Sequence, residues 1–101
     1  NEPGYYKAGH FGIRIENLVV VTPQSIAGAE EEMLGFETIT FAPIAQNLVD
    51  VALLSDGEAD WLDAYHAEVL EKLGAGMAGE ECAWLEAACA PLDRTPAALA
   101  A

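Results

Sequence analysis

Apolar residues in the first part of the chain fall into two patterns that both predict β-strands. Residues 18–21 form a continuous apolar run, typical of a strand buried on both faces, and Thr22-Pro23 is expected to end it. A second strand is predicted from about residue 35 to residue 42, because threonine and isoleucine fill its centre. Pro43 is expected to close that strand, since proline removes a donor from the ladder.

A hairpin that turns near Gly9 is predicted within residues 1–22, and it places Glu2 and Glu16 symmetrically about the turn. Side chains alternate along a strand, so Arg14 and Glu16 share one face. Directly opposed positions are about 4.5–5.5 Å apart, and like charges placed there are destabilising. A cation between the two carboxylates would offset that repulsion, and hard divalent cations are held by carboxylate oxygens. The pattern leaves two interpretations open: surface glutamates flanking a hairpin, or a pair of metal ligands.

Two helices are predicted in the second half of the chain. Ser55, followed three residues later by Glu58, has the capping-box spacing of a helix start. Apolar residues then recur at helical spacing until the Gly-Ala-Gly sequence at 74–76, which is expected to stop the helix. The second helix is predicted over residues 80–90, with acids in its first turn. The predicted apolar positions are Trp61, Leu62, Tyr65, Val69 and Leu73 in the first helix, and Trp84, Leu85 and Ala88 in the second.

The order of elements predicts the α+β class, with antiparallel strands followed by two helices. We expect three segments: strands over residues 1–54, a helical extension over 55–91 and a loose tail over 92–101. A polar connection with three glutamates lies between the strands and is interpreted as a solvated surface. Both histidines are interpreted as structural, His10 as an exposed loop residue and His66 as a helix-surface or interface residue.

Charge and composition exclude several classes of partner. The chain has 101 residues, 17 of them acidic and four basic, and its formal net charge is −13. That charge argues against binding to a phosphate backbone, so no nucleic acid is expected. No stretch approaches the roughly 20 apolar residues that span a bilayer, so no membrane partner is expected. Hydrophobic residues make up 52% of the chain, enough for a core, and the strand faces are expected to seek a partner.

Cys82 and Cys89 are the only cysteines. On one helix their Cα atoms would lie about 10.5 Å apart, whereas a disulfide needs less than about 7 Å. We therefore expect two free cysteines, interpreted as small apolar residues, which agrees with a reducing cytoplasm.

Four ordered motifs resemble one enzyme family. Glu-Pro-Gly-Tyr-Tyr at 2–6 and Phe-Gly-Ile-Arg-Ile-Glu-Asn at 11–17 resemble the last two metal-ligand segments of the pita-bread metallopeptidases. Residues 36–54 and the segment Trp-Leu-Asp-Ala-Tyr-His at 61–66 are similar to the closing part of the Xaa-Pro aminopeptidase (aminopeptidase P) group. The resemblance covers residues 1–73, with a weaker echo at 83–87.

The resemblance implies a dinuclear metal site and a particular reaction. Family members bind two divalent ions, commonly Mn²⁺, and remove an N-terminal residue that precedes proline. By resemblance, Glu2 is a metal ligand and the general base for the attacking water, and Glu16 is the bridging ligand. Arg14 would orient a ligand carboxylate, or would merely neutralise surface acids. The family's remaining ligands, two aspartates and a histidine, lie upstream of the glutamates.

We therefore expect a C-terminal piece of the catalytic domain, inactive by itself and located in the cytoplasm. Its expected partners are peptides with proline in second position, and either the missing catalytic part or a second copy of the parent in a homodimer. Two alternatives remain open: a non-catalytic pita-bread module that binds a protein or ligand, and a prolidase-type dipeptidase on the same fold. Tyr5 and Tyr6 are interpreted as packing residues.

Overall fold

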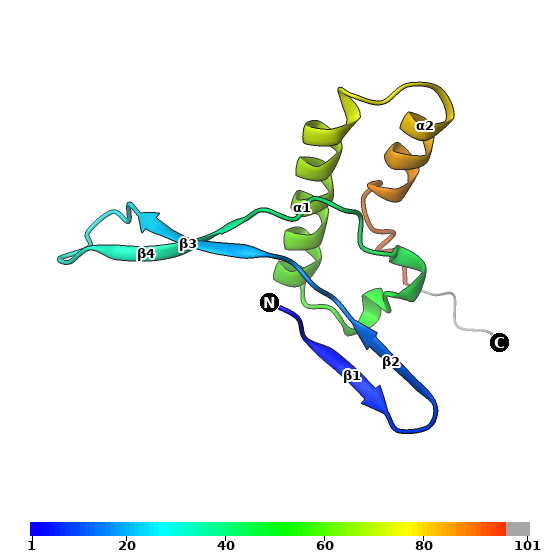
Figure 1. The fold of residues 1–101 in the computed structure, drawn as a ribbon, viewed down its shortest axis with the longest axis horizontal. Coiled ribbons are helices and arrows are strands. Elements are labelled where there is room, and N and C mark those ends of the chain that lie inside the picture. Colours follow the sequence, from blue (N-terminus) through cyan, green and yellow to red (C-terminus); the bar gives the residue numbers. More distant parts are fainter. Residues whose placement is uncertain (97–101) are drawn as a thin grey trace. The chain divides into compact units, whose positions relative to one another are not determined.

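Two antiparallel hairpins make up the first forty residues of the computed structural model, which describes residues 1–96 (Figure 1). Strand β1 (Gly4–Lys7) pairs with β2 (Phe11–Arg14), and β3 (Val19–Gln24) pairs with β4 (Met33–Thr38). These strands belong to one compact unit, Asn1–Thr40, and a second unit begins at Phe41. The two sheets are separate, with two strands each.

The β1–β2 hairpin turns where the sequence predicts. Gly4 pairs with Arg14 and Lys7 with Phe11, so three residues remain for the loop. The His10 amide donates to the Lys7 carbonyl at 3.0 Å, and Gly9 has a φ of 74°. Glycine adopts this left-handed conformation without strain, which is why a short three-residue loop closes here. His10 lies exposed in the turn, as predicted.

The β3–β4 hairpin differs from the sequence prediction in its limits. β3 continues through Pro23 to Gln24, and β4 begins at Met33 and ends at Thr38. The Ile39 amide donates to the Leu18 carbonyl at 2.9 Å, so hydrogen-bonded pairs alternate from there, and the Pro23–Leu34 pair is not one of them. The missing N–H of Pro23 therefore costs no ladder bond, and the prediction that proline ends the strand was wrong.

The apolar run at residues 18–21 is not buried on both faces in this chain. Leu18 is 60% exposed and Val21 is 58% exposed. A two-stranded hairpin has no neighbouring strand or covering layer of its own, and such hairpins are marginally stable alone. The apolar run thus indicates a strand correctly, but its predicted burial is wrong for the chain as described.

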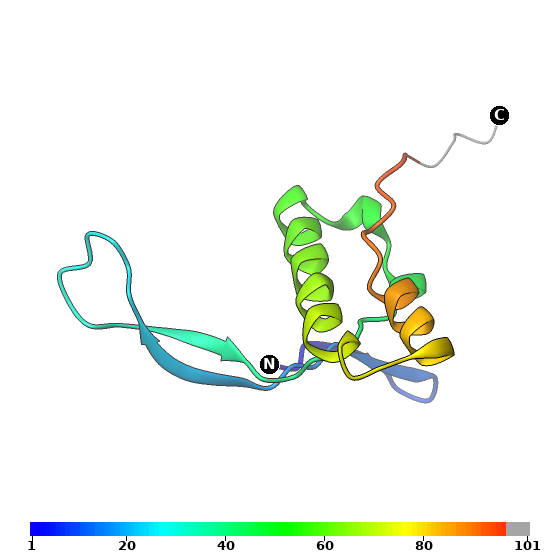
Figure 2. The same ribbon diagram turned by 90° about the horizontal axis from the view of Figure 1, so that it is seen from above.

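The second unit holds two helices and the described hydrophobic core. Two short 3₁₀ turns, η1 (Gln46–Leu48) and η2 (Val51–Leu53), precede α1 (Asp56–Gly74), and α2 (Gly79–Ala88) lies beside α1 (Figures 1 and 2). The buried apolar residues of the described range come from both helices and the segment after them: Ala59, Leu62, Tyr65, Val69, Leu85, Cys89 and Leu92. Antiparallel strands followed by two helices confirm the predicted α+β class.

Both tryptophans differ from the predicted apolar stripes. Trp61 is 54% exposed and Trp84 is 62% exposed, although the Trp61 ring stacks on Tyr65 with centroids 5.4 Å apart. Leu62 and Leu85, one position along each helix, take the buried places instead. A helix turns by about 100° per residue, so neighbouring apolar residues cannot both face a narrow core.

The segment after α2 is anchored rather than loose as far as the structure describes it. The Asp63 carboxylate accepts from the Leu92 amide at 2.8 Å and pairs with the Arg94 guanidinium at 2.6 Å. Arg94 also pairs with Asp60 at 2.8 Å. The Leu92 amide and then Arg94 lower the pKa of Asp63. The rest of the predicted tail, residues 97–101, lies outside the described residues, and the predicted limits at 54 and 91 remain predictions.

The start of α1 confirms the predicted capping box. The Ser55 hydroxyl accepts from the Glu58 amide at 3.2 Å, and the Glu58 carboxylate accepts from the Ser55 amide at 2.8 Å. Two amides of the first turn, which have no partner within the helix, are thereby satisfied.

Replacing Ser55 by alanine should lower the free energy of unfolding by about 1 kcal/mol, the usual cost of losing an N-cap acceptor. Urea denaturation followed by circular dichroism measures it. Ser25, the only other serine, lies exposed outside the helices, so Ser25→Ala is the matched control and should change stability little. Equal effects of the two substitutions would show that the cap does not stabilise α1.

Candidate metal centre

The β1–β2 ladder extends beyond its formal strand ends and brings Glu2 opposite Glu16. The Ile15 amide donates to the Pro3 carbonyl at 3.1 Å, and the Asn17 amide donates to the Asn1 carbonyl at 3.0 Å. The Asn1 nitrogen donates back to the Asn17 carbonyl at 3.1 Å. Glu2 and Glu16 therefore occupy the position between two hydrogen-bonded pairs, where facing side chains approach most closely. The predicted symmetry of the two glutamates about the turn is correct.

Arg14 is the cation that holds these two carboxylates together in this chain. Its guanidinium lies 3.2 Å from a Glu16 oxygen and 3.8 Å from a Glu2 oxygen. The three side chains share one face, because Arg14 precedes Glu16 by two residues and Glu2 faces Glu16. The side chains are 45–62% exposed, and exposed pairs typically contribute only about 0–1 kcal/mol. These two ion pairs therefore stabilise the hairpin only slightly.

Tyr6 lies on the same face, a feature that sequence reasoning missed. It pairs with Gly12 across the hairpin, and its ring occupies the space above that glycine: a Cβ on Gly12 would lie 2.7 Å from the ring. A Cβ on Gly4 would lie 2.9 Å from both the Tyr6 hydroxyl and the Arg14 side chain. The two glycines thus let the phenol lie along the hairpin toward Arg14. The interpretation of Tyr6 as an ordinary packing residue fits poorly, because the side chain is 65% exposed.

The donor set on this face suits a hard divalent cation but is incomplete. Carboxylate oxygens are ligands that Mg²⁺, Ca²⁺ and Mn²⁺ accept readily. Within residues 1–96, however, no group of three or more His, Cys, Asp or Glu side chains comes together in a metal-binding arrangement. Two glutamates alone do not make a stable metal centre, which requires further ligands.

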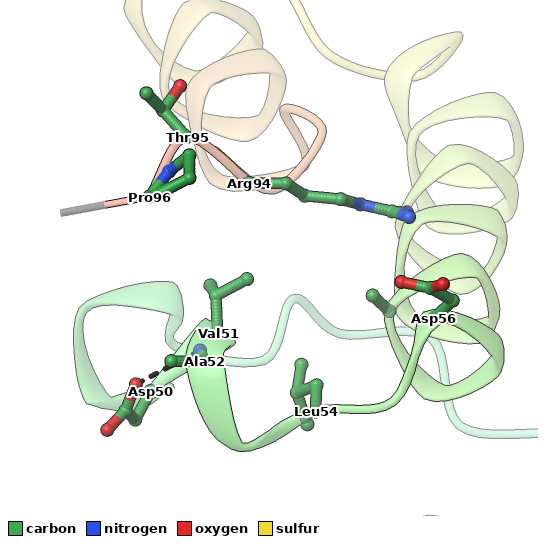
Figure 3. Close-up of a pocket in the computed structure, with 9 residues that line it drawn as sticks. Asp50, Val51, Ala52, Leu54, Asp56, Arg94, Thr95 and Pro96 are labelled. Carbon is green, nitrogen blue, oxygen red and sulfur yellow. Dashed lines mark hydrogen bonds between the residues drawn. The ribbon is translucent and has the colours of Figure 1, made fainter.

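A pocket of about 480 Å³ lies within the second unit (Figure 3). Its lining includes Asp50, Asp56 and Arg94, and the Arg94 side chain reaches across to α1. There Asp60 and Asp63 form ion pairs with the guanidinium and balance its charge. Arg94 therefore does not direct its charge into the pocket. Glu2 and Glu16 do not line this pocket, so it is not part of the candidate metal centre.

Cys82 and Cys89 are both free thiols. Among the described residues, no helix is long and apolar enough to cross a bilayer. Cys89 is buried, which raises the pKa of its thiol, while Cys82 is only partly buried.

Comparison with known proteins decides the family. Residues 32–92 match the family described as the C-terminal region of peptidase_M24. The chain belongs to this family. The resemblance seen in the sequence is thereby confirmed. The match begins after Glu16, so it does not assign roles to the glutamate pair.

Two relatives of this chain are named as aminopeptidases. The chain is 48% identical over 98 residues to the probable Xaa-Pro aminopeptidase P of Laccaria bicolor, covering 91% of this chain and 15% of that protein. It is 55% identical over 83 residues to aminopeptidase P2 of Arabidopsis thaliana, covering 78% of this chain and 11% of that protein.

A solved structure has the same fold. The X-prolyl aminopeptidase of Caenorhabditis elegans, described as a cytosolic enzyme with a di-nuclear active site, matches with a TM-score of 0.81 and 36% identity. The match covers 90% of this chain and 15% of that chain. This peptidase_M24 chain therefore spans 11–15% of the length of these relatives.

Proposed function

We propose that this chain supplies the closing part of the catalytic domain of a dinuclear-metal Xaa-Pro aminopeptidase. The observation that carries the proposal is the placement of Glu2 directly opposite Glu16, with Arg14 between them. Two carboxylates that face each other offer oxygen ligands of the kind that hard divalent cations prefer. The relatives named as aminopeptidases support the assignment of reaction class.

Glu2 and Glu16 would hold the metal ions, and we assign Mn²⁺ as the preferred metal. A bound pair of divalent ions lowers the pKa of water and stabilises negative charge on the scissile carbonyl. Glu2 would also act as general base, accepting the proton of the attacking water on one carboxylate oxygen. Glu16 would serve as the bridging ligand. Arg14, a permanent cation beside both, would orient the carboxylates and limit their rotation.

The substrates of this assignment are peptides with proline in second position. Because the described residues place only two ligands on the face, we expect no peptidase activity from this chain alone. Further ligands would come from additional catalytic sequence, and the active protein would be this chain joined to that part or a homodimer of the whole. A cytoplasmic location agrees with the two free cysteines and with the description of the Caenorhabditis elegans enzyme.

Titration calorimetry with MnCl₂ tests whether the face is a half-site. We expect weak binding, with a Kd of order 10⁻⁴–10⁻³ M, the range of sites with few charged ligands. The Glu2→Ala/Glu16→Ala variant should lose this binding.

The matched control is Glu31→Ala/Glu32→Ala, which removes the same charge from an exposed loop. Binding that survives in the control and vanishes in the hairpin variant supports the proposal. The same binding isotherm in both variants would mean that manganese responds only to net charge, and the proposed ligand roles would fall.

A further inference from the structure

Residues 41–48, which we call the strap, run along the helices of the second unit (Figure 1). Two consecutive side chains of α1 hold its backbone. The Tyr65 hydroxyl donates to the Ala42 carbonyl at 3.1 Å and accepts from the Ala42 amide at 3.3 Å. The Ile44 amide donates to Nε2 of His66 at 3.0 Å. Alternate residues of the strap are thus fastened to one turn of α1.

Gln46 joins the far end of the strap to the last residue of α2 and to the segment after it. Its side-chain nitrogen donates to the Ala90 carbonyl at 2.6 Å and to the Ala88 carbonyl at 3.2 Å. The same nitrogen lies 3.4 Å from Nδ1 of His66. Both protons of this nitrogen are directed to carbonyls, so it donates no hydrogen bond to Nδ1.

His66 is the buried polar residue of the described range, with 0% exposure. Of the two predicted positions, a helix surface or an interface, the surface one is wrong, because the ring is buried against the strap. A ring nitrogen that accepts a hydrogen bond carries no proton, so the neutral ring is protonated at Nδ1. Protonation could occur only at Nε2, the atom that accepts from Ile44.

We propose that His66 is a proton-operated latch, and that its protonation at Nε2 releases the strap from α1. The added proton turns the acceptor into a donor, so two N–H groups would face each other at the Ile44 contact. A buried amide without an acceptor is costly, and so is a buried charge. The strap directly follows Thr40 in sequence, so its release would loosen the segment that joins the hairpins to the helices.

The surroundings of His66 favour its neutral form. Burial lowers the pKa of His66, and the negative charge of Asp63, one turn earlier on α1, opposes that shift. Asp63 is itself engaged by Arg94 from the segment after α2, which weakens its pull on a proton. Cys89, directly after α2, has a buried thiol whose pKa is raised, so it is neutral, and the strap carries no titratable side chain.

The sign of the pH effect follows from this shift. Because the folded pKa lies below 6.5, the released state binds more protons than the latched state just below that pH. The strap is therefore latched above pH 6.5. As pH falls from 6.5 toward the folded pKa, the opening constant should rise up to about tenfold per pH unit.

Two NMR measurements on the chain test the latch. The chain has only two histidines, so a His10→Gln variant leaves the imidazole signals of His66 alone. We expect these signals to titrate with a midpoint below 6.5. The protection factor of the Ile44 amide, measured by hydrogen exchange, should fall as pH is lowered through the same range. A midpoint at or above 6.5, or a pH-independent protection factor at Ile44, would overturn the proposal.

His66→Gln separates the latch from general acid destabilisation. The glutamine carbonyl retains an acceptor for Ile44 but does not titrate, so the protection factor should become flat over this range. If it still falls as in the wild type, another group is responsible and the proposal fails. Should the variant not fold, the His66 titration in His10→Gln and the wild-type Ile44 protection factors still decide, because neither depends on the substitution.

Discussion

Replacing Leu85 by alanine is expected to lower the free energy of unfolding of the helical unit by about 2–5 kcal/mol, the range for large-to-small substitutions in cores. Leu85 is 1% exposed and is the buried residue that α2 contributes within its own limits. The described core has only seven buried apolar residues, so few neighbours can move into the space left behind. The free energy of unfolding of a native domain is about 5–15 kcal/mol in total. The variant should therefore be only marginally stable.

Urea denaturation followed by far-ultraviolet circular dichroism measures this loss. Trp84→Ala is the matched control, because it removes a larger side chain from the adjacent position of the same helix. Trp84 is 62% exposed, so its substitution should cost well under half as much. A control as destabilising as Leu85→Ala would mean that Trp84 packs in the folded chain, and the buried face of α2 would have to be reassigned.

The sequence predicted those elements whose signals are local. The turn at Gly9 and the helix start at Ser55 depend on residues within a few positions of each other, and both were correct. The opposition of Glu2 and Glu16 followed from the turn, since the position of the turn fixes the register of the hairpin.

Features that depend on contacts distant in sequence could not be predicted in the same way. The imidazole of His66 is satisfied by an amide 22 residues earlier, and nothing near His66 in sequence signals that partner. Pro23 can lie within β3 only because Pro23 and Leu34 form a pair without ladder hydrogen bonds. Which pairs are hydrogen-bonded depends on the register between β3 and β4, and nothing near Pro23 in sequence signals it.

The candidate site shows the same division. The two glutamates and Arg14 were found from spacing and resemblance, whereas the position of Tyr6 depends on the absence of side chains across the hairpin. Once the register is known, Gly12 opposite Tyr6 is a usable signal, because a large side chain facing a glycine has room to lie flat.

Removing one carboxylate of the glutamate pair should nearly abolish peptidase activity in an assembled enzyme. The test is a chimera in which this chain replaces the segment that it matches in the Caenorhabditis elegans X-prolyl aminopeptidase, whose structure it shares with a TM-score of 0.81. In the chimera, Glu16→Gln preserves size but replaces a charged oxygen by an amide nitrogen. Loss of residues that only support metal ligands typically costs 10–100-fold, so loss of a ligand should lower kcat/KM by at least about 100-fold.

The controls in the chimera distinguish a ligand from a surface charge. Glu37→Gln removes an exposed strand glutamate outside the β1–β2 hairpin and should leave kcat/KM unchanged. Arg14→Ala should lower kcat/KM by about 10–100-fold, which is more than Glu37→Gln and less than Glu16→Gln. The reason is that Arg14 contacts the carboxylates without accepting the proton. Excess Mn²⁺ should not restore Glu16→Gln, since added metal cannot supply the ligand oxygen that we propose for Glu16. If Glu16→Gln matches the Glu37→Gln control in an active chimera, the glutamate pair is a surface feature neutralised by Arg14.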